Sequence, residues 1–257
     1  MKRRALIKAI PLGLGAATFS LSFPSLMAAI AGEKKENWNY NNPENWGDIS
    51  QEYQVCQVGT QQSPIDLVSS IPSTLDPIEV VYQDIPLKIL NNSHTIQVNS
   101  NPGNYIILDG KKFDLLQFHF HHPGEHTLMG KKYPMEVHFV HKKSQDELAV
   151  LGVFLKEGQT NPIIQSIWDV MPSQKTEETL IEGVKISIEK LLPKKCQAYR
   201  YFGSLTTPPC SEVVHWTVFD EPIEISSAQI NQFKQIFPLN ARPIQPLNRR
   251  FILSFSK

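Results

Sequence analysis

The stretch Leu115-Leu-Gln-Phe-His-Phe-His-His122 predicts both how this chain folds and where its chemistry lies. Successive side chains of a β-strand point to opposite faces, so His119 and His121 share one face with Gln117. The other face carries apolar side chains, which we expect in a hydrophobic core: Leu116, Phe118 and Phe120. The stretch therefore predicts a strand with one core face and one polar face.

A second stretch, Met135-Glu-Val-His-Phe-Val-His141, alternates in the same way. Its Glu136 and His138 lie in phase with each other and share one face. If the two strands are neighbours, His138 can converge on one point with the two in-phase histidines of the first strand. A lone histidine in a strand is usually structural, but three that converge favour a metal site.

Three neutral imidazoles suit Zn²⁺, and three protein ligands leave a fourth position for water, as in catalytic zinc sites. The sequence therefore predicts a zinc site made by His119, His121 and His138. Gln117 and Glu136 are candidate acceptors for the distal ring nitrogens of these ligands. Three further histidines lie out of phase or off the strands, and we interpret them as structural: His122, His126 and His141.

Short β-rich runs separated by turn signals dominate the chain after about residue 78. We expect strands at 87–90, 95–98, 104–108, 113–122, 136–141 and 149–155. We expect helices at 161–171, 184–192 and 226–236, and irregular structure at 33–60. These patterns predict one α+β domain, mostly β, around a large twisted and mainly antiparallel sheet with short peripheral helices.

Composition narrows the class of protein. The chain has 257 residues, which suits one large domain or two small ones, and 41% of them are hydrophobic, enough to build a proper core. Lys+Arg and Asp+Glu number 25 each. This balance argues against nucleic acid as a partner, since a nucleic-acid binder carries a basic surplus.

The first 31 residues resemble an export signal. Lys2-Arg3-Arg4 precedes an uncharged apolar run over 9–31 that ends in the small-x-small pattern Ala29-Ile-Ala31. The paired arginines are typical of a twin-arginine signal. A retained membrane anchor is the alternative, although prolines and glycines interrupt the run. We therefore predict a signal peptide at 1–31, a mature domain at 32–257 without a stable membrane span, and a periplasmic or extracellular location.

Three cysteines remain in the mature chain: Cys56, Cys196 and Cys210. In an exported protein an odd number suggests one disulfide and one free thiol. Spacing alone does not choose among the three possible pairings.

Several short blocks carry a resemblance to a known family: Trp38-Asn-Tyr40, Gln62-Ser-Pro-Ile-Asp66, Gln117-Phe-His-Phe-His121, Gly124-Glu-His-Thr127, Glu136-Val-His-Phe-Val-His141, Gly203-Ser-Leu-Thr-Thr-Pro-Pro-Cys210 and Asn240-Ala-Arg-Pro243. Together they resemble the α-class carbonic anhydrases of the exported bacterial type. The resemblance covers nearly all of the mature chain. It implies a zinc lyase (carbonate dehydratase) that interconverts CO₂ and bicarbonate, as a monomer or dimer.

The resemblance also implies a mechanism. A zinc-bound hydroxide attacks CO₂, while Thr206 accepts a hydrogen bond from that hydroxide and donates its own proton to Glu125. His94 shuttles the released proton, with Tyr40, Asn92 and Gln97 holding a chain of water. An exposed strand histidine is the competing interpretation of His94. The residues implied to contact the substrate are Val140, Val150, Leu205, Thr207, Val214 and Trp216.

By the same resemblance Cys56 pairs with Cys210, which leaves Cys196 without a role. Two other functions remain as alternatives. A non-catalytic binding module is disfavoured because all three ligand histidines are present. A zinc esterase is disfavoured because nothing in the sequence indicates a large ester pocket.

Overall fold

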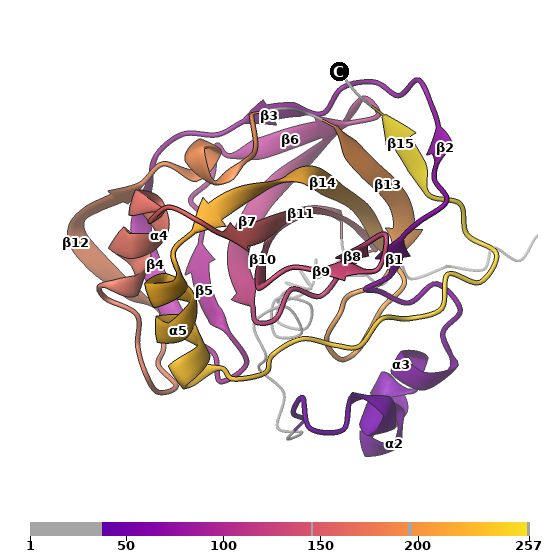
Figure 1. Cartoon of the computed structure of the whole chain (residues 1–257), viewed down its shortest axis with the longest axis horizontal. Coiled ribbons are helices and arrows are strands. Elements are labelled where there is room, and N and C mark those ends of the chain that lie inside the picture. Colours follow the sequence, from indigo (N-terminus) through magenta and orange to yellow (C-terminus); the bar gives the residue numbers. More distant parts are fainter. Residues whose placement is uncertain (1–37, 145, 195–196, 256–257) are drawn as a thin grey trace, which may run out of the picture.

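A twelve-stranded sheet runs through the centre of the protein in the computed structural model, which describes residues 38–144, 146–194 and 197–255 (Figure 1). The main path of the sheet follows the order β12 (Thr179–Ile186), β4 (Ile85–Asn91), β5 (Ile96–Asn99), β7 (Lys111–His121), β10 (Met135–Ser144), β11 (Glu147–Glu157), β14 (Val214–Ile225), β13 (Ala198–Gly203), β15 (Leu253–Phe255) and β2 (Ile71–Pro72). Off this path, β3 (Glu79–Val81) pairs with β6 (Tyr105–Leu108), which also pairs with β7.

Most strand pairs in this sheet are antiparallel, and β11 with β14 and β15 with β2 are parallel. A smaller sheet is formed by β1 (Asp66–Leu67), β8 (Thr127–Leu128) and β9 (Lys131–Lys132). The prediction of a large, mainly antiparallel sheet is therefore confirmed. Among the described residues, no helix combines the length and the apolar character that a membrane crossing needs.

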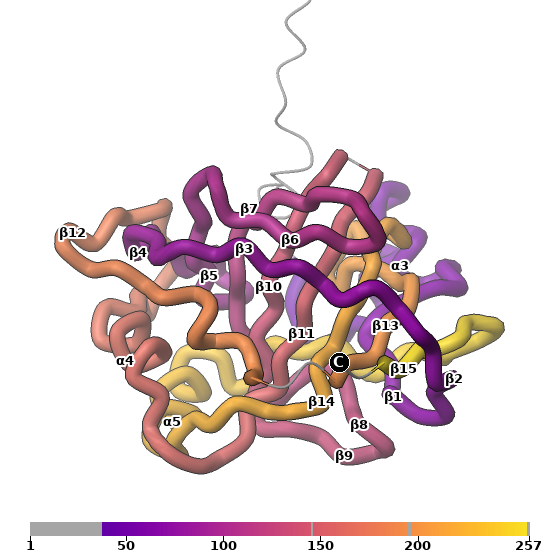
Figure 2. Tube along the Cα trace, turned by 90° about the horizontal axis from the view of Figure 1, so that it is seen from above, coloured from indigo at the N-terminus to yellow at the C-terminus, as the bar shows by residue number. Residues whose placement is uncertain are grey.

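The helices are short and lie at the periphery: α2 (Trp46–Ile49), α3 (Val55–Val58), α4 (Pro162–Trp168) and α5 (Ser227–Ile236), with 3₁₀ turns at Pro43–Asn45, Gln51–Tyr53 and Ile188–Leu191. Figure 2 shows α4 and α5 at one end of the molecule, opposite α3 and β2. The Asn161 side chain caps α4 by accepting from two backbone N–H groups, and Ser226 forms a capping box with Gln229 at the start of α5. These caps fix the two helices that the sequence predicts there.

Two expectations about local structure are wrong. The stretch 184–192 is not a helix, because its first residues complete β12 and only Ile188–Leu191 forms a 3₁₀ turn. Gly183 adopts a positive φ of 76° where the register of β12 shifts against β4. This break interrupts the regular alternation of side chains by which a strand is recognised in the sequence. The stretch 43–58 contains short helical turns in place of irregular structure.

The two faces of β7 and β10 lie in different environments. Phe118, Phe120 and Phe139 belong to the larger core cluster, where α4 covers them through Trp168, whose ring lies 4.6 Å from that of Phe120. The side chains that alternate with them point into a pocket on the other side. The sheet therefore separates a packed core from the candidate site, as the alternation predicts for Phe118 and Phe120. The expectation for Leu116 is wrong: this residue is half-buried outside the cluster, because the pairing of β7 with β10 shifts by one residue there and brings Leu115 into the core instead.

Candidate metal centre

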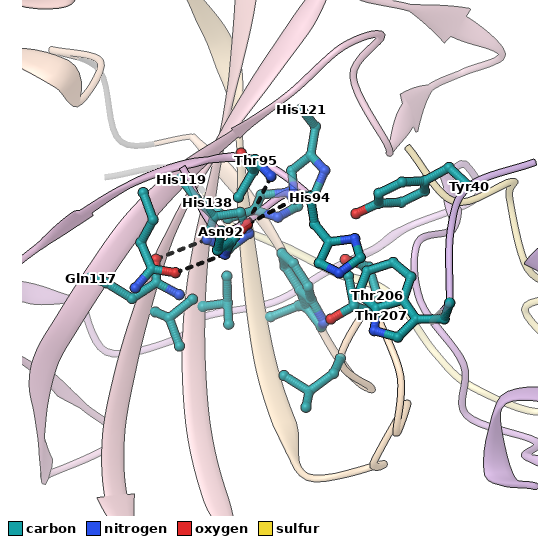
Figure 3. A pocket seen from close by; sticks show the side chains of 16 residues that line it. Tyr40, Asn92, His94, Thr95, Gln117, His119, His121, His138, Thr206 and Thr207 are labelled. Carbon is teal, nitrogen blue, oxygen red and sulfur yellow. Dashed lines mark hydrogen bonds between the residues drawn. The ribbon is translucent and has the colours of Figure 1, made fainter. Parts of the chain in front are cut away.

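A pocket with a volume of about 60 Å³ opens over the polar face of β7 and β10 (Figure 3). His119 and His121 come from β7, and His138 comes from β10, where it pairs directly with His119. Candidate ligand atoms of the three rings all lie within 4.8 Å of one another. The convergence that the sequence predicts is therefore present in the structure.

Each of the three rings is held by an acceptor on its outer side. Nδ1 of His119 lies 2.9 Å from Oε1 of Gln117, and Nε2 of His138 lies 2.8 Å from Oε1 of Glu136. Nδ1 of His121 lies 2.7 Å from the Asn240 carbonyl oxygen. Because a carbonyl or carboxylate oxygen only accepts, each of these ring nitrogens donates its hydrogen. The lone pairs then lie on Nε2 of His119, Nε2 of His121 and Nδ1 of His138.

The protonation state of the rings suits metal binding. Burial lowers the pKa of His119 well below its ordinary value and lowers that of His121 to about 4. Burial also lowers the pKa of His138, although Glu136 opposes this shift. All three rings are therefore neutral at pH 7, and a metal does not have to displace a proton from them.

One buried ring nitrogen in this group has no partner among the described residues. Nε2 of His121 is buried and makes no hydrogen bond with the described residues. Such an atom is costly unless something binds it, because a buried polar group normally keeps a partner. Three neutral imidazole nitrogens, one of them orphaned, match the ligand set that Zn²⁺ takes. The residues present therefore fit a zinc ion.

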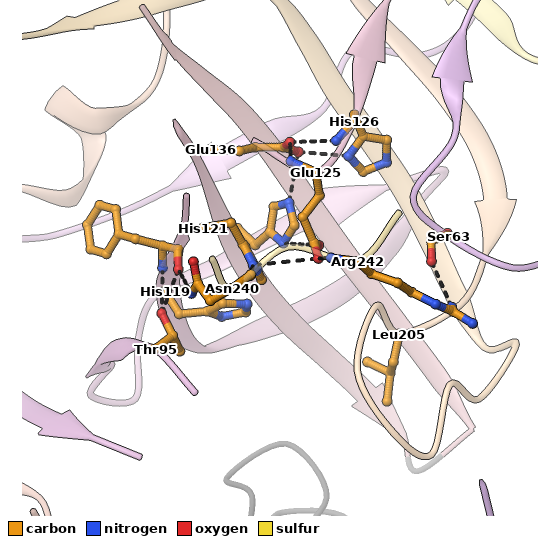
Figure 4. A network of polar contacts seen from close by, with 12 residues as sticks. Ser63, Thr95, His119, His121, Glu125, His126, Glu136, Leu205, Asn240 and Arg242 are labelled. Atoms are coloured by element: carbon orange, nitrogen blue, oxygen red, sulfur yellow. Dashed lines mark hydrogen bonds and ion pairs between the residues drawn. The ribbon is translucent and has the colours of Figure 1, made fainter. Parts of the chain in front are cut away.

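Glu136 lies behind the ligands and is fully buried. Its carboxylate accepts from the backbone N–H groups of Glu125 and His126, both at 2.8 Å, and from the rings of His126 and His138 (Figure 4). Burial raises the pKa of Glu136, but the two histidines outweigh burial and hold this pKa well below its usual range. Gly152 leaves the necessary room, since a Cβ there would lie 3.1 Å from Glu136 Oε1.

His126, interpreted from the sequence as structural, extends this network. Its Nδ1 lies 2.7 Å from Glu136, and its Nε2 lies 2.6 Å from the Tyr201 hydroxyl, which donates to Ser63. Asn240 holds His121 through its backbone carbonyl. No local pattern predicts these contacts, because the partners of each come from distant parts of the chain.

Glu125 and Thr206 are neighbours, as the resemblance implies. Oε1 of Glu125 accepts from the Arg242 backbone N–H at 2.8 Å, whereas Oε2 has no partner with hydrogen-bond geometry. Burial raises the pKa of Glu125, and His138, the Arg242 N–H and the Thr206 hydroxyl oppose the rise. The Thr206 hydroxyl therefore lies close enough to act on this carboxyl group, and Thr206 itself lines the pocket.

The apolar wall of the pocket contains most of the residues expected there. Those that line it are Val140, Val150, Leu205, Thr207 and Trp216. Val214 does not line the pocket, because its side chain is fully buried in the adjoining core cluster. The expectation that Val214 contacts the substrate is therefore wrong. Trp38 and Thr95 line the pocket without having been expected to.

His94 lies in the turn between β4 and β5, half-buried at the rim of the pocket. Its ring stacks on Trp38 with 3.7 Å between ring centroids, so it is not the exposed strand histidine of the alternative interpretation. Burial, followed by the positive charge of Lys175, lowers its pKa to about 4. In this position the ring is neutral at pH 7.

The three residues expected to hold water line the same rim. Oδ1 of Asn92 accepts from the backbone N–H groups of His94 and Thr95, so it fixes the turn that presents the His94 ring. Its Nδ2 donates to Gln97 at 3.3 Å. Burial raises the pKa of Tyr40 well above its usual value, so its hydroxyl remains protonated and able to donate.

The disulfide joins Cys56 to Cys210, the pairing that the resemblance implies. It ties α3 to the loop that carries Thr206 and Thr207, and the backbone N–H of Cys210 donates to the Thr207 carbonyl. Cys196 and the expected signal peptide at 1–31 lie outside the described residues.

Comparisons with known proteins agree with this site. A family model described as eukaryotic-type carbonic anhydrase matches residues 41–256. A carbonic anhydrase of Nostoc sp. is 44% identical over 259 residues, covering 98% of this chain and 97% of that protein. A solved α-carbonic anhydrase of Thermovibrio ammonificans, in complex with the inhibitor sulfanilamide, is 45% identical. It has a TM-score of 0.82 and covers 86% of this chain and 100% of its own.

Proposed function

The chain belongs to the α-carbonic anhydrase family, and we propose that it hydrates CO₂ reversibly to bicarbonate and a proton at a zinc ion held by His119, His121 and His138. The observation that carries this proposal is the convergence of three neutral ring nitrogens, one of which is buried without a partner in the part of the chain that the structure describes. When bound by three histidines, Zn²⁺ supplies a hydroxide nucleophile near neutral pH, which is already established for carbonic anhydrases.

Thr206 orients the nucleophile. A carboxylate only accepts hydrogen bonds, so the Thr206 hydroxyl donates its single hydrogen to Glu125. Its oxygen is then left to accept from a group in the pocket. The Arg242 backbone N–H holds the other oxygen of Glu125 at 2.8 Å and so fixes the direction of the pair. A nucleophile that donates to Thr206 would then have its hydrogen directed away from the substrate.

The apolar wall receives the substrate. Val140 and Val150 are buried and pair across β10 and β11, and Trp216 pairs with Val150 from β14. CO₂ has no net charge or dipole, so this wall accepts it while offering water few hydrogen bonds. Thr207 lies at the same wall and can donate its hydroxyl to the product bicarbonate.

His94 passes the released proton to buffer. While the His94 ring is stacked on Trp38, its pKa is about 4, so the ring is a weak proton acceptor at pH 7. We propose that the ring leaves the indole face to accept the proton, which restores a pKa nearer to the ordinary value of about 6.5. Once the ring has left the indole face, its rotamer changes are those of an exposed side chain, which take picoseconds to nanoseconds.

Stopped-flow CO₂ hydration tests the proposed function. The purified mature chain is measured as isolated, after removal of metal by a chelator, and after addition of one equivalent of Zn²⁺. We expect hydration to disappear with the metal and to return with Zn²⁺. Stoichiometric zinc with no hydration above the buffer rate would instead favour the non-catalytic alternative.

We also propose that residues 1–31 direct twin-arginine export to the periplasm or beyond. The Cys56–Cys210 disulfide supports this, since disulfides persist in oxidising compartments. Replacing Arg3-Arg4 by Lys-Lys should retain the protein, uncleaved, inside the cell. Unchanged export of that variant would exclude the twin-arginine route.

A further inference from the structure

A second cleft, distinct from the metal pocket, lies where the end of β6 meets β13, β14 and β15. Its volume of about 380 Å³ exceeds that of the metal pocket and falls within the range of sites for small ligands. Its walls are mainly apolar, with contributions from Leu75, Leu108, Phe202, Phe251 and Leu253. Figure 1 shows β13, β14 and β15 side by side at this end of the sheet.

Two aromatic side chains at this cleft remain open to solvent. The exposed fraction of Phe251 is 71% and that of Phe202 is 38%. The ring of His215 lies edge-on to Phe202 at 5.2 Å, and burial lowers the pKa of His215, so this ring is neutral at pH 7. An apolar body placed in the cleft would remove aromatic surface from water, which is favourable.

Two arginines line the cleft, and among the described residues only one of them has a carboxylate partner. Nη1 of Arg200 pairs with Asp109 at 3.0 Å, and its Nη2 donates to the Asp76 carbonyl. The charge of Arg200 is therefore compensated within the cleft.

Arg250 has no such compensation. Its guanidinium donates to three backbone carbonyls, those of Leu247, Phe202 and Pro246, which leaves two of its five N–H groups without a hydrogen-bond partner in the part of the chain that the structure describes. No carboxylate of the described residues lies within ion-pair distance of it, and Glu212 acts on it only from farther away. One positive charge therefore remains in a mostly apolar cleft.

We propose that this cleft binds a small monocarboxylate with an aromatic or branched apolar body. The carboxylate accepts from the free N–H groups of Arg250, in the geometry that guanidinium groups favour. The body packs against Phe251 and Phe202. A single positive charge without a carboxylate partner favours a monoanion over a phosphate dianion, and the apolar walls offer a small, strongly hydrated ion such as bicarbonate few hydrogen-bond partners.

The cleft also borders the proposed reaction site. Trp216 lines both cavities, and Tyr201, which lines the second, contacts His126 through its hydroxyl. A bound carboxylate therefore lies behind the wall of the metal pocket. The binding proposal itself does not depend on the proposed function.

The test is a titration of the full-length, zinc-loaded protein with 4-fluorobenzoate, followed by ¹⁹F NMR, with neutral 4-fluorobenzamide as the comparison ligand. Arg250→Gln should raise the Kd for the benzoate roughly tenfold or more, because a charge-assisted hydrogen bond is lost. Arg249→Gln, an exposed neighbour outside the cleft with the same charge change, should alter the Kd less than about twofold. The benzamide should bind far more weakly than the benzoate to the unaltered protein.

Two further variants guard against misfolding. Arg250→Lys keeps the charge and should retain most of the affinity, and Phe251→Ala should weaken binding roughly threefold by removing apolar contact. Equal binding in all variants would place the benzoate elsewhere, the metal pocket included, and would overturn the proposal. So would sedimentation showing a dimer that Phe251→Ala dissociates, since the cleft would then be an interface between copies.

Discussion

The two faces of β7 and β10 are built from alternating residues of the same strands, yet they depend on different properties. On one face Phe118, Phe120 and Phe139 are fully buried in a continuous apolar core. On the other face each histidine ring has its own acceptor at 2.7 to 2.9 Å. The core face needs shape and volume, whereas the site face needs particular atoms in particular places.

The difference also appears in how each face treats buried polar atoms. On the core face, the buried ring of His141 has a partner at both nitrogens, the Tyr82 hydroxyl and the Ala149 carbonyl. The site face keeps Nε2 of His121 buried without a hydrogen-bond partner among the described residues. Such atoms destabilise a fold unless a ligand satisfies them. The site face therefore lowers the stability of the fold in exchange for a binding site. Substitutions on the site face should mainly change the rate of hydration, and those on the core face should mainly change the free energy of unfolding.

The largest effect is expected on the site face. His119→Ala removes one of three metal ligands and should lower kcat/KM for CO₂ hydration roughly a thousandfold or more, since several kcal/mol of charge stabilisation are lost. Stopped-flow kinetics and zinc analysis measure this. The unfolding midpoint of the metal-free protein should change little. If His119→Ala kept its zinc and its rate of CO₂ hydration, the assignment of the chemistry to the site face would be wrong.

The matching substitution on the core face is Phe120→Ala. It leaves a cavity against Trp168 and should lower the free energy of unfolding by about 3–5 kcal/mol, measured by urea titration. Hydration per folded, zinc-loaded molecule should change less than about twofold at temperatures where the fold survives. A large loss of activity in the folded protein would show that the faces are not independent.

A smaller effect is expected one layer behind the ligands. Glu136→Gln removes the carboxylate that accepts from the His126 and His138 rings, so zinc affinity should fall roughly 10–100-fold. Competition with a chromophoric chelator measures this affinity. Glu157→Gln, which makes the same change at an exposed position on β11, is the matched control and should leave the affinity unaltered. Equal effects of the two variants would contradict the role of Glu136.

The smallest effect is expected at the rim of the pocket. His94→Ala should slow hydration roughly tenfold in weak buffer, because proton export then limits turnover. Added imidazole should restore part of the rate, and zinc content should not change. Full activity of this variant in weak buffer would remove His94 from proton transfer.

The sequence predicts the parts of the site that follow a local rule. Alternation places His119 and His121 together, and the same rule applied to the second stretch adds His138. It also predicts Gln117 and Glu136 as acceptors, since each lies two residues before a ligand on the same face. The fold class follows from the same short, alternating runs.

The remaining features depend on distant parts of the chain. Asn240 reaches His121 from a segment that no strand pattern marks, and it does so with its backbone carbonyl, which any residue would supply. His94 is stacked on Trp38 because the N-terminal segment returns to cover the rim. The second cleft forms where four strands meet, and its free charge depends on which carboxylates lie near Arg250.

Zinc K-edge X-ray absorption spectroscopy of the purified mature protein tests the central claim most directly. The expected spectrum has three imidazole nitrogens and one oxygen at roughly 2.0–2.1 Å, with one zinc per chain. A spectrum with fewer than three imidazoles, with sulfur in the first shell, or without stoichiometric zinc would contradict the assignment of His119, His121 and His138 as one metal centre.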